Sequence, residues 1–307
     1  MIFLFSATIT YFFLKLSLPF LTNNFADLPN HRSSHNSLVP TGGGIGFVIV
    51  GIVGMALYGN YSALLCLPLA IVGFWDDKVS LNPIFRYFIQ LLTVSLLFFA
   101  SSSGIQLYGS ISLFLFIPIY LCYLIAATAI INFINFMDGL DGLVGSSMAI
   151  IVAFFCFSVD NSLLPLLGAL LGFLKLNWSP AKVFMGDGGS TFLGAILVWC
   201  ILNTNSFEKS FAILLIATPL LLDASVCVIR RYFDGQRIFE AHSLHLFQRL
   251  HKAGWKHEMV TSLYLTFTAL ISLVYLIFNL TPALIMVALS LFFGIWLDKR
   301  YAIPFRD

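Results

Sequence analysis

Residues 111–132 read ISLFLFIPIYLCYLIAATAIIN, a stretch without a single charged side chain. A helix needs about 20 apolar residues to cross the hydrocarbon core of a bilayer, and this stretch provides them. Similar runs follow one another along the whole chain, which is 59% hydrophobic and only 10% charged. Soluble domains carry about 25% charged residues. The sequence therefore predicts an all-α, polytopic membrane protein rather than a soluble fold with an anchor.

The apolar runs predict about eleven transmembrane helices in a single membrane domain over residues 1–307, or ten if a short run is not a span of its own. The predicted spans are approximately 2–21, 42–58, 62–75, 84–101, 111–132, 142–158, 162–176, 189–203, 209–229, 259–279 and 281–297. The first run lacks a basic start and a small-residue cleavage site. We therefore expect it to be retained as a span rather than removed as a signal peptide.

The basic residues predict how the chain is oriented. If the N-terminus is outside, all of the 16 basic residues except Lys15 and Lys209 fall in or beside segments that face the cytoplasm. Cytoplasmic loops are the ones that carry excess lysine and arginine, so we expect the working face there. The net charge of +2 is spread over these loops and gives no reason to expect nucleic acid as a partner. The five cysteines lie within apolar runs, where small buried side chains are expected.

Adjacent carboxylates, Asp76 and Asp77, end one predicted span on the cytoplasmic side. Two neighbouring carboxylates repel each other, which raises the pKa of one of them unless a cation lies between them. The pair favours a divalent-metal site or a general base made more basic by its neighbour. A solvated span end, with Lys78 as a partner, is the alternative.

A second polar motif follows the span at 111–132. Its members recur at every third residue and would form one polar ridge on a helix: Asn132, Asn135, Asp138 and Asp141. Two Asp-Gly steps would then end that helix and let the backbone approach a ligand closely. The ridge indicates either a ligand site or hydrogen bonds between helices.

Residues 184–191 read FMGDGGST and precede an apolar helix. Ser190 or Thr191 can cap that helix, and amides exposed at a helix start attract anions. Asp187 would then bridge a cation to a phosphate held there, although a capped loop without a ligand is the alternative. The glycines at 42–44 are explained equally well by close helix packing or by phosphate contact.

The largest predicted cytoplasmic segment contains several cationic side chains. If it is a helix at the membrane interface, these residues share one face and favour binding of a diphosphate, with a lipid-headgroup surface as the alternative: His242, His245, Arg249 and Lys252. Zinc is less favoured, because no third ligand accompanies the two histidines in the sequence. Asp223 is the only acid well inside a span, and we expect it to be protonated or paired with Arg230 or Arg231.

Taken together and in this order, the motifs resemble the polyprenyl-phosphate N-acetylhexosamine-1-phosphate transferases. That family includes the phospho-muramoyl-pentapeptide translocase and the enzymes that start O-antigen and other envelope glycans. The resemblance runs from residue 30 to residue 251, and residues 241–249 resemble the branch that uses GlcNAc, FucNAc or QuiNAc. Relatives commonly read Pro-Thr-Pro-Arg before the glycines, whereas this chain reads Val39, Pro40 and Thr41. A basic residue is therefore missing there, or is replaced by Arg32.

The resemblance implies transfer of an N-acetylamino-sugar 1-phosphate from a UDP-sugar to undecaprenyl phosphate, with release of UMP, in a bacterial inner membrane. It implies Mg²⁺, or Mn²⁺ in its place, held by Asp187 and Asp77. Asp76 would deprotonate or orient the lipid phosphate, so that these three acids are the expected catalytic residues. The expected substrate-binding residues are Arg86, Asn135, Asp138, Asp141, His242, His245 and Arg249. Direct attack by the lipid phosphate is the preferred mechanism, with a covalent phospho-aspartate as its rival.

A cation- or metabolite-coupled transporter is the alternative function. Transporters place ionisable residues near the bilayer midplane, often in broken helices of paired repeats. Here nearly all the acids lie at one predicted surface, only Asp223 is deeper, and no repeat is evident. Membrane lipids are expected partners, and a homodimer is left open.

Overall fold

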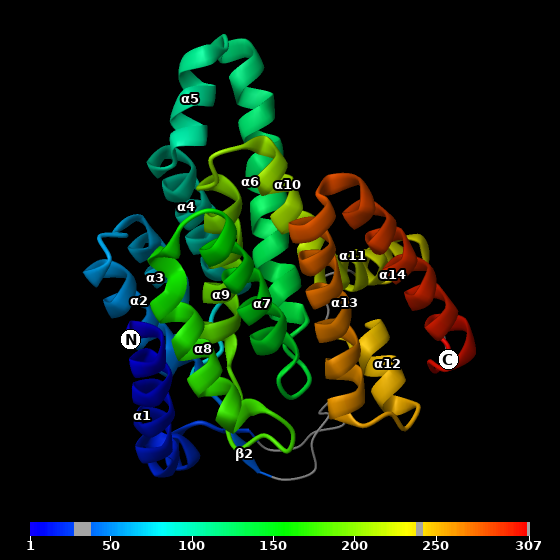
Figure 1. The fold of residues 1–307 in the computed structure, drawn as a ribbon. Helices are drawn as coiled ribbons and strands as arrows, with labels where there is room; N and C mark the ends of the chain where they lie inside the picture. Colours follow the sequence, from blue (N-terminus) through cyan, green and yellow to red (C-terminus); the bar gives the residue numbers. More distant parts are fainter. Residues whose placement is uncertain (28–37, 238–241, 306–307) are drawn as a thin grey trace.

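The structure is a computed structural model, and it describes residues 1–27, 38–237 and 242–305. Five of its helices are long and apolar enough to cross a membrane (Figure 1). They are α1 (Ile2–Asn24), α4 (Pro83–Ala100), α6 (Leu113–Phe136), α13 (His257–Phe278) and α14 (Leu280–Arg300). A bent pair, α10 (Phe207–Ile216) and α11 (Thr218–Phe233), meets at 69° and counts as a sixth candidate if it forms one span.

The remaining elements are shorter. The helices are α2 (Gly44–Leu57), α3 (Leu67–Asp76), α5 (Ser102–Ser110), α7 (Leu143–Ser158), α8 (Leu164–Asn177), α9 (Asp187–Leu202) and α12 (Leu246–Lys252), with 3-10 turns η1 (Ser62–Cys66) and η2 (Asn161–Leu163). Two antiparallel strands, β1 (Ala26–Asp27) and β2 (Val39–Pro40), are the only other regular elements in the described ranges. The all-α class with several apolar helices is confirmed, whereas the count of ten or eleven spans and the orientation stay predictions.

The core of the bundle surrounds α9. Every residue of α9 from Gly188 to Cys200 is buried, and α2, α3, α6 and α7 pack around it. By contrast, α1, α4, α6 and α14 carry many exposed large apolar side chains. A soluble protein rarely exposes so much continuous apolar surface. An apolar outside around a packed centre is what a helical bundle in lipid requires.

Glycines bring three helix ends together at one place. A Cβ on Gly73, near the end of α3, would lie 2.5 Å from the Cα of Gly188 at the start of α9. A Cβ on Gly44, at the start of α2, would lie 2.5 Å from the Cα of Gly189. Small residues let membrane helices approach at backbone distance. The close packing that the sequence offered for the glycines at 42–44 is therefore present, and it positions the start of α9 against α2 and α3.

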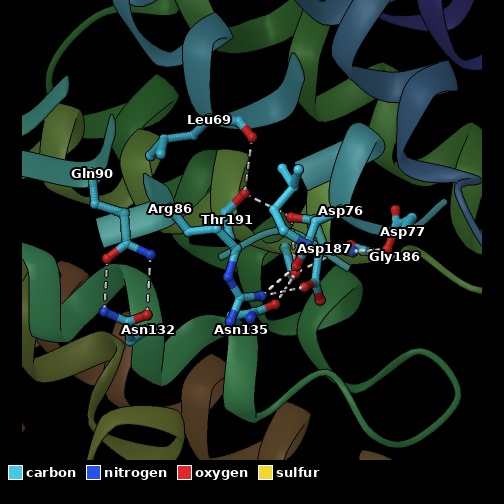
Figure 2. Close-up of polar contacts among 12 residues, drawn as sticks. Leu69, Asp76, Asp77, Arg86, Gln90, Asn132, Asn135, Gly186, Asp187 and Thr191 are labelled. Atoms are coloured by element: carbon cyan, nitrogen blue, oxygen red, sulfur yellow. Dashed lines mark hydrogen bonds and ion pairs between the residues drawn. The ribbon is translucent and has the colours of Figure 1, made fainter. Parts of the chain in front are cut away.

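The predicted ridge of four polar residues on one helix is wrong beyond Asn135. Helix α6 ends at Phe136, so Asp138 and Asp141 lie in the following loop, residues 137–142. Gly142 closes that loop with φ +72°, a conformation that glycine adopts without steric cost. Asn132 exchanges two hydrogen bonds of 2.9 and 3.1 Å with Gln90 of α4, so it joins two helices (Figure 2).

The predicted interfacial helix with one cationic face is also wrong. Helix α12 begins only at Leu246, so its early histidines precede it and the four cationic side chains share no helical face. The reason lies in Asp223 of α11, whose carboxylate accepts the N–H groups of Leu246 at 2.8 Å and Phe247 at 3.1 Å. A carboxylate on the free amides of a helix start fixes where that helix begins.

The same contacts correct the expected partner of Asp223. Its Oδ2 accepts a hydrogen bond of 2.6 Å from the Tyr264 hydroxyl on α13. Arg230 instead pairs with Asp298 at 2.7 Å, and Arg231 donates to Gln236 at 3.1 Å. Asp223 therefore joins α11, α12 and α13 rather than pairing with an arginine of its own helix.

Candidate active site

The adjacent carboxylates at the end of α3 turn to different partners (Figure 2). Asp76 accepts the N–H of Leu81 at 2.6 Å and forms an ion pair with Arg86 on α4. Asp77 accepts the backbone N–H of Asp187, at the start of α9, at 2.8 Å. These separate partners hold two like charges side by side, which would otherwise repel each other.

Asp187 is the first residue of α9, where the helix dipole favours a carboxylate. Its Oδ2 lies 3.3 Å from Nη1 of Arg86, the same nitrogen that pairs with Asp76. One guanidinium therefore bridges the end of α3 to the start of α9, as Figure 2 shows. Gly186 precedes Asp187 with φ +78° and leaves no room for a Cβ beside Asp77.

Asp77 keeps one oxygen free. Its Oδ2 is buried and has no hydrogen-bond partner among the described residues. Burial, with a smaller contribution from Asp76, raises the pKa of Asp77 to about 6, although amides of Asp187 and Gly188 oppose the shift. A buried carboxylate oxygen without a partner is costly unless a ligand or a proton satisfies it. This oxygen is therefore available as a ligand for a cation.

The loop at 137–142 adds a fourth carboxylate. Burial raises the pKa of Asp138 to about 8, and the negative charges of Asp187, Asp77 and Asp141 add to the rise. Arg86 is the cation that the described structure pairs with this group of acids. Carboxylate oxygens are the protein ligands that Mg²⁺ takes, often one or two of them beside phosphate oxygens. The donor set and the orphaned oxygen of Asp77 therefore fit a magnesium ion.

Hydroxyl groups fasten the start of α9 to its neighbours. Ser190 donates a short hydrogen bond to Oδ1 of Asn135 on α6, and Thr191 donates to the carbonyl oxygen of Leu69 on α3 at 3.4 Å. Asn135 lies beside Arg86 in Figure 2. The predicted substrate residue Asn135 is therefore at the site, and in the ligand-free protein it positions α9.

Asp141 is held by the protein on both oxygens. Its Oδ1 lies 3.2 Å from Nδ1 of His257 on α13, and its Oδ2 accepts the N–H of Ala181 at 3.1 Å. Although burial alone would raise it, these hydrogen bonds and the nearby His257 leave the pKa of Asp141 below its usual value. Asp141 therefore anchors the loop at 137–142 to α13 and to the segment before α9. His257 was not singled out in the sequence, because it begins an apolar run without a motif.

The histidine segment, residues 242–252, lies on the other side of the loop at 137–142 from the acids. A Cβ on Gly139 would lie 3.1 Å from the Phe247 ring in α12, and the rings of Phe136 and His245 are 6.4 Å apart. Burial, together with His245 and Arg231, lowers the pKa of His242 to about 4. The ring is therefore neutral at neutral pH, and it can meet a phosphate only as a hydrogen-bond partner, without the positive charge that the sequence led us to expect.

Arg249 is buried and is bound by other groups of the protein. Its side chain is 4% exposed, forms an ion pair with Asp298 on α14, and donates to the carbonyl oxygens of Leu244 at 3.0 Å and Ile303 at 2.8 Å. It holds α12 to the end of α14, so its expected contact with substrate would require these bonds to break. Sequence reasoning missed Asp298, because that acid stands before Lys299 and Arg300 in what looked like an ordinary basic tail.

Residues 39–44, where the sequence departs from the motif of the resembled family, lie against the turn that carries Asp187. Gly43 and Gly44 donate backbone hydrogen bonds to the carbonyl oxygens of Phe184 at 2.8 Å and Met185 at 2.9 Å. These bonds set the turn that carries Asp187. Arg32, the expected replacement for the missing basic residue, lies outside the described residues, as do Glu240 and Ala241.

The sequence of this chain is similar to a family model and to several known proteins. The family model described as glycosyl transferase family 4 matches residues 60–205, which include the acids from Asp76 to Asp187. An undecaprenyl-phosphate alpha-N-acetylglucosaminyl 1-phosphate transferase of Escherichia coli K12 is 30% identical over 286 residues, covering 83% of this chain and 76% of the relative. A probable undecaprenyl-phosphate N-acetylglucosaminyl 1-phosphate transferase of Bacillus subtilis is 27% identical over 258 residues, covering 76% and 71%. A phospho-N-acetylmuramoyl-pentapeptide-transferase of Kosmotoga olearia is 34% identical over 112 residues, covering 36% and 35%.

Proposed function

Since this chain belongs to glycosyl transferase family 4, we propose that it transfers an N-acetylamino-sugar 1-phosphate from a UDP-sugar to undecaprenyl phosphate and releases UMP. The observation that carries the proposal is the convergence of Asp76, Asp77, Asp138 and Asp187 where helix ends meet, with Arg86 paired to Asp76 and Asp187. The relatives from Escherichia coli and Bacillus subtilis are named for undecaprenyl phosphate and an N-acetylglucosaminyl 1-phosphate group. GlcNAc, FucNAc and QuiNAc are the candidate sugars, and a bacterial cytoplasmic membrane is the expected location.

The reaction explains why so many acids lie together. Both the lipid phosphate and the UDP-sugar are anions, so a cation is needed before one phosphate attacks the other. When bound, Mg²⁺ neutralises charge on the phosphates and on the leaving UMP. Asp77 and Asp187 would hold it, since Asp77 has a free buried oxygen and Asp187 is half-exposed at the start of α9. Asp138 is close enough to influence both acids and completes the carboxylate set.

Asp76 has two open roles, as a base for the lipid phosphate or as the residue that orients it. The Asp76 carboxylate already has two partners within the protein, Arg86 on one oxygen and the N–H of Leu81 on the other. We therefore favour the orienting role. Asp76 would hold Arg86, whose side chain is 39% exposed, and Arg86 would face the incoming phosphate.

The UDP-sugar would bind next to the loop at 137–142. Asn135 and Asp138 border the acids, and the half-buried His242 lies across that loop near α12. The neutral imidazole of His242 can donate one hydrogen bond to the sugar nucleotide. The transporter alternative loses its main support, because the deep acid Asp223 is engaged in capping α12.

The test is UMP release by the purified full chain, with undecaprenyl phosphate, Mg²⁺ and a panel of UDP-N-acetylamino sugars that begins with UDP-GlcNAc. We expect UMP from one donor, only with lipid and metal present, and at least a hundredfold less from Asp187→Asn. Asp160→Asn is the matched control, since Asp160 lies past the far end of α7, away from the acids. Equal turnover by the two variants would remove Asp187 from the site, and silence across the panel in folded protein would count against the transferase.

A further inference from the structure

A buried sulfur and two imidazoles meet between α11 and the start of α12. The candidate ligand atoms of Cys227, His242 and His245 all lie within 4.8 Å of one another. Cys227 and His245 are buried, and His242 is half-buried. Cys227 lies within an apolar helix, far from the histidines in sequence. The third ligand that the sequence lacked is therefore supplied by the fold.

The three atoms form a donor set with a strong metal preference. Thiolate and imidazole ligands favour zinc and similar ions, whereas Mg²⁺ prefers oxygen. In a tetrahedral zinc site, bonds of about 2.1 Å to nitrogen and 2.3 Å to sulfur place the ligand atoms roughly 3.3–3.8 Å apart. The present atoms need to close by about 1 Å, which small side-chain rotations provide. Ligand chemistry thus separates this cluster from the carboxylate site.

The two histidines are in states that suit a metal. Nδ1 of His242 accepts the N–H of Leu244 at 3.3 Å, a long hydrogen bond that a metal on the same lone pair would replace. Nδ1 of His245 lies 3.7 Å from Oδ1 of Asp223, which is too far for a hydrogen bond. A carboxylate next to a ligand histidine is the usual outer partner of a zinc site. Asp223 is one helical turn before Cys227, so it stands on the same face of α11 as the sulfur.

A cavity borders the sulfur ligand, Cys227. It lies between α11, α13 and α14, and its lining includes Cys227 and Asp223. The same lining includes Arg230, whose side chain is 37% exposed. The buried thiol therefore borders a space that reaches the outside of the bundle.

We propose that Cys227, His242 and His245 bind one Zn²⁺ ion, with the fourth position open to water. Three protein ligands with one open position are a known arrangement for zinc. Such an ion would tie residues 242–245 to α11 through one ring nitrogen of each histidine, and the other nitrogen of His242 would remain an N–H donor. The proposal does not rest on the proposed transferase function, because the protein supplies the ligands by itself.

The test uses Co²⁺ as a spectroscopic substitute for zinc in the full-length protein, purified in detergent with a non-thiol reductant. We expect one equivalent of Co²⁺ to give a thiolate-to-cobalt charge-transfer band that stoichiometric Zn²⁺ abolishes. Cys227→Ala should lose the band. Cys156→Ala, which removes another buried cysteine of α7, should keep it. No substrate is present, so failure here is separate from failure of the transferase assay.

Thermal midpoints without metal show whether each variant is folded. In folded protein, His242→Gln should raise the dissociation constant for Co²⁺ at least about tenfold, since even outer partners of metal sites cost that much. The proposal is overturned by a wild-type protein without the band. It is equally overturned if Cys227→Ala keeps the band, or if His242→Gln binds Co²⁺ as tightly as the wild type.

Discussion

Gly186→Ala tests whether the turn before α9 sets the geometry of the acid site. Gly186 has φ +78° and ψ 168°, a region of the backbone that is essentially confined to glycine. An added Cβ would lie 2.8 Å from Oγ1 of Thr41 and 3.0 Å from Cγ of Asp77, and closer still to its Oδ2. Carbon atoms pack at about 3.5–4.0 Å, so Asp77 must move by roughly 0.5–1 Å.

The substitution should change both the folding free energy and the rate of UMP release. Backbone strain at this position costs on the order of 1–3 kcal/mol of folding free energy. Displacement of Asp77 also disturbs its hydrogen bond to the N–H of Asp187, so both expected metal ligands shift together. A displacement of about 1 Å in a catalytic group costs about a hundredfold in rate. We therefore expect lipid-dependent UMP release to fall about a hundredfold while the protein remains folded.

The matched control is Gly59→Ala. Gly59 also has a positive φ, +80°, but nothing lies within 4 Å of its would-be Cβ. Both variants should lower the thermal midpoint, whereas only Gly186→Ala should lose turnover. If Gly186→Ala turns over within a few-fold of Gly59→Ala in folded protein, the contact between this turn and Asp77 does not set the site.

Three further measurements test the buried ion pair of Arg249, the protonation of Asp138 and the mechanism of transfer. Asp298→Asn leaves the buried Arg249 without its carboxylate, so we expect a loss of roughly 3–5 kcal/mol in stability, seen as a lower thermal midpoint; an unchanged midpoint would contradict the assigned role. Burial raises the pKa of Asp138 to about 8 while the unfolded chain loses that proton near pH 4, so the stability of metal-free protein should fall between about pH 4 and pH 8, and Mg²⁺ should bind more tightly above it. Flat midpoints and flat Mg²⁺ affinity over that range would refute the shift. Labelled UMP should not exchange into UDP-sugar without lipid acceptor, and clear exchange would instead establish a covalent phospho-aspartate.

The sequence predicted the class of fold and much of the acid site, because both depend on local patterns. Apolar runs fix helices in lipid, and the segment around Gly186 indicates a tight turn into a helix. The same local information failed at Asp138, where helix α6 ends one turn earlier than the polar spacing implied. The spacing is equally compatible with a helix and with a loop that folds back, and only the packing of that loop on α12 decides.

The histidine segment shows a second limit. A cationic helical face was a reasonable expectation for residues 242–252, but the start of α12 is set by Asp223, which lies on another helix. Similarly, Asp298 and Arg249 are distant in sequence, and their ion pair follows from the docking of α12 on the end of α14. Contacts between distant segments leave no mark in the spacing of either one. These were the residues whose roles the sequence could not assign.

The proposed function requires that the carboxylate cluster transfers a sugar together with its phosphate. The most direct measurement uses UDP-GlcNAc, or the donor that the panel identifies, labelled with ³²P in the phosphate next to the sugar. We expect label to enter the lipid fraction while unlabelled UMP is released, and we expect Asp187→Asn to abolish both. Label that stays in soluble UDP while the sugar alone reaches the lipid would contradict the claim, as would transfer that survives the loss of Asp187.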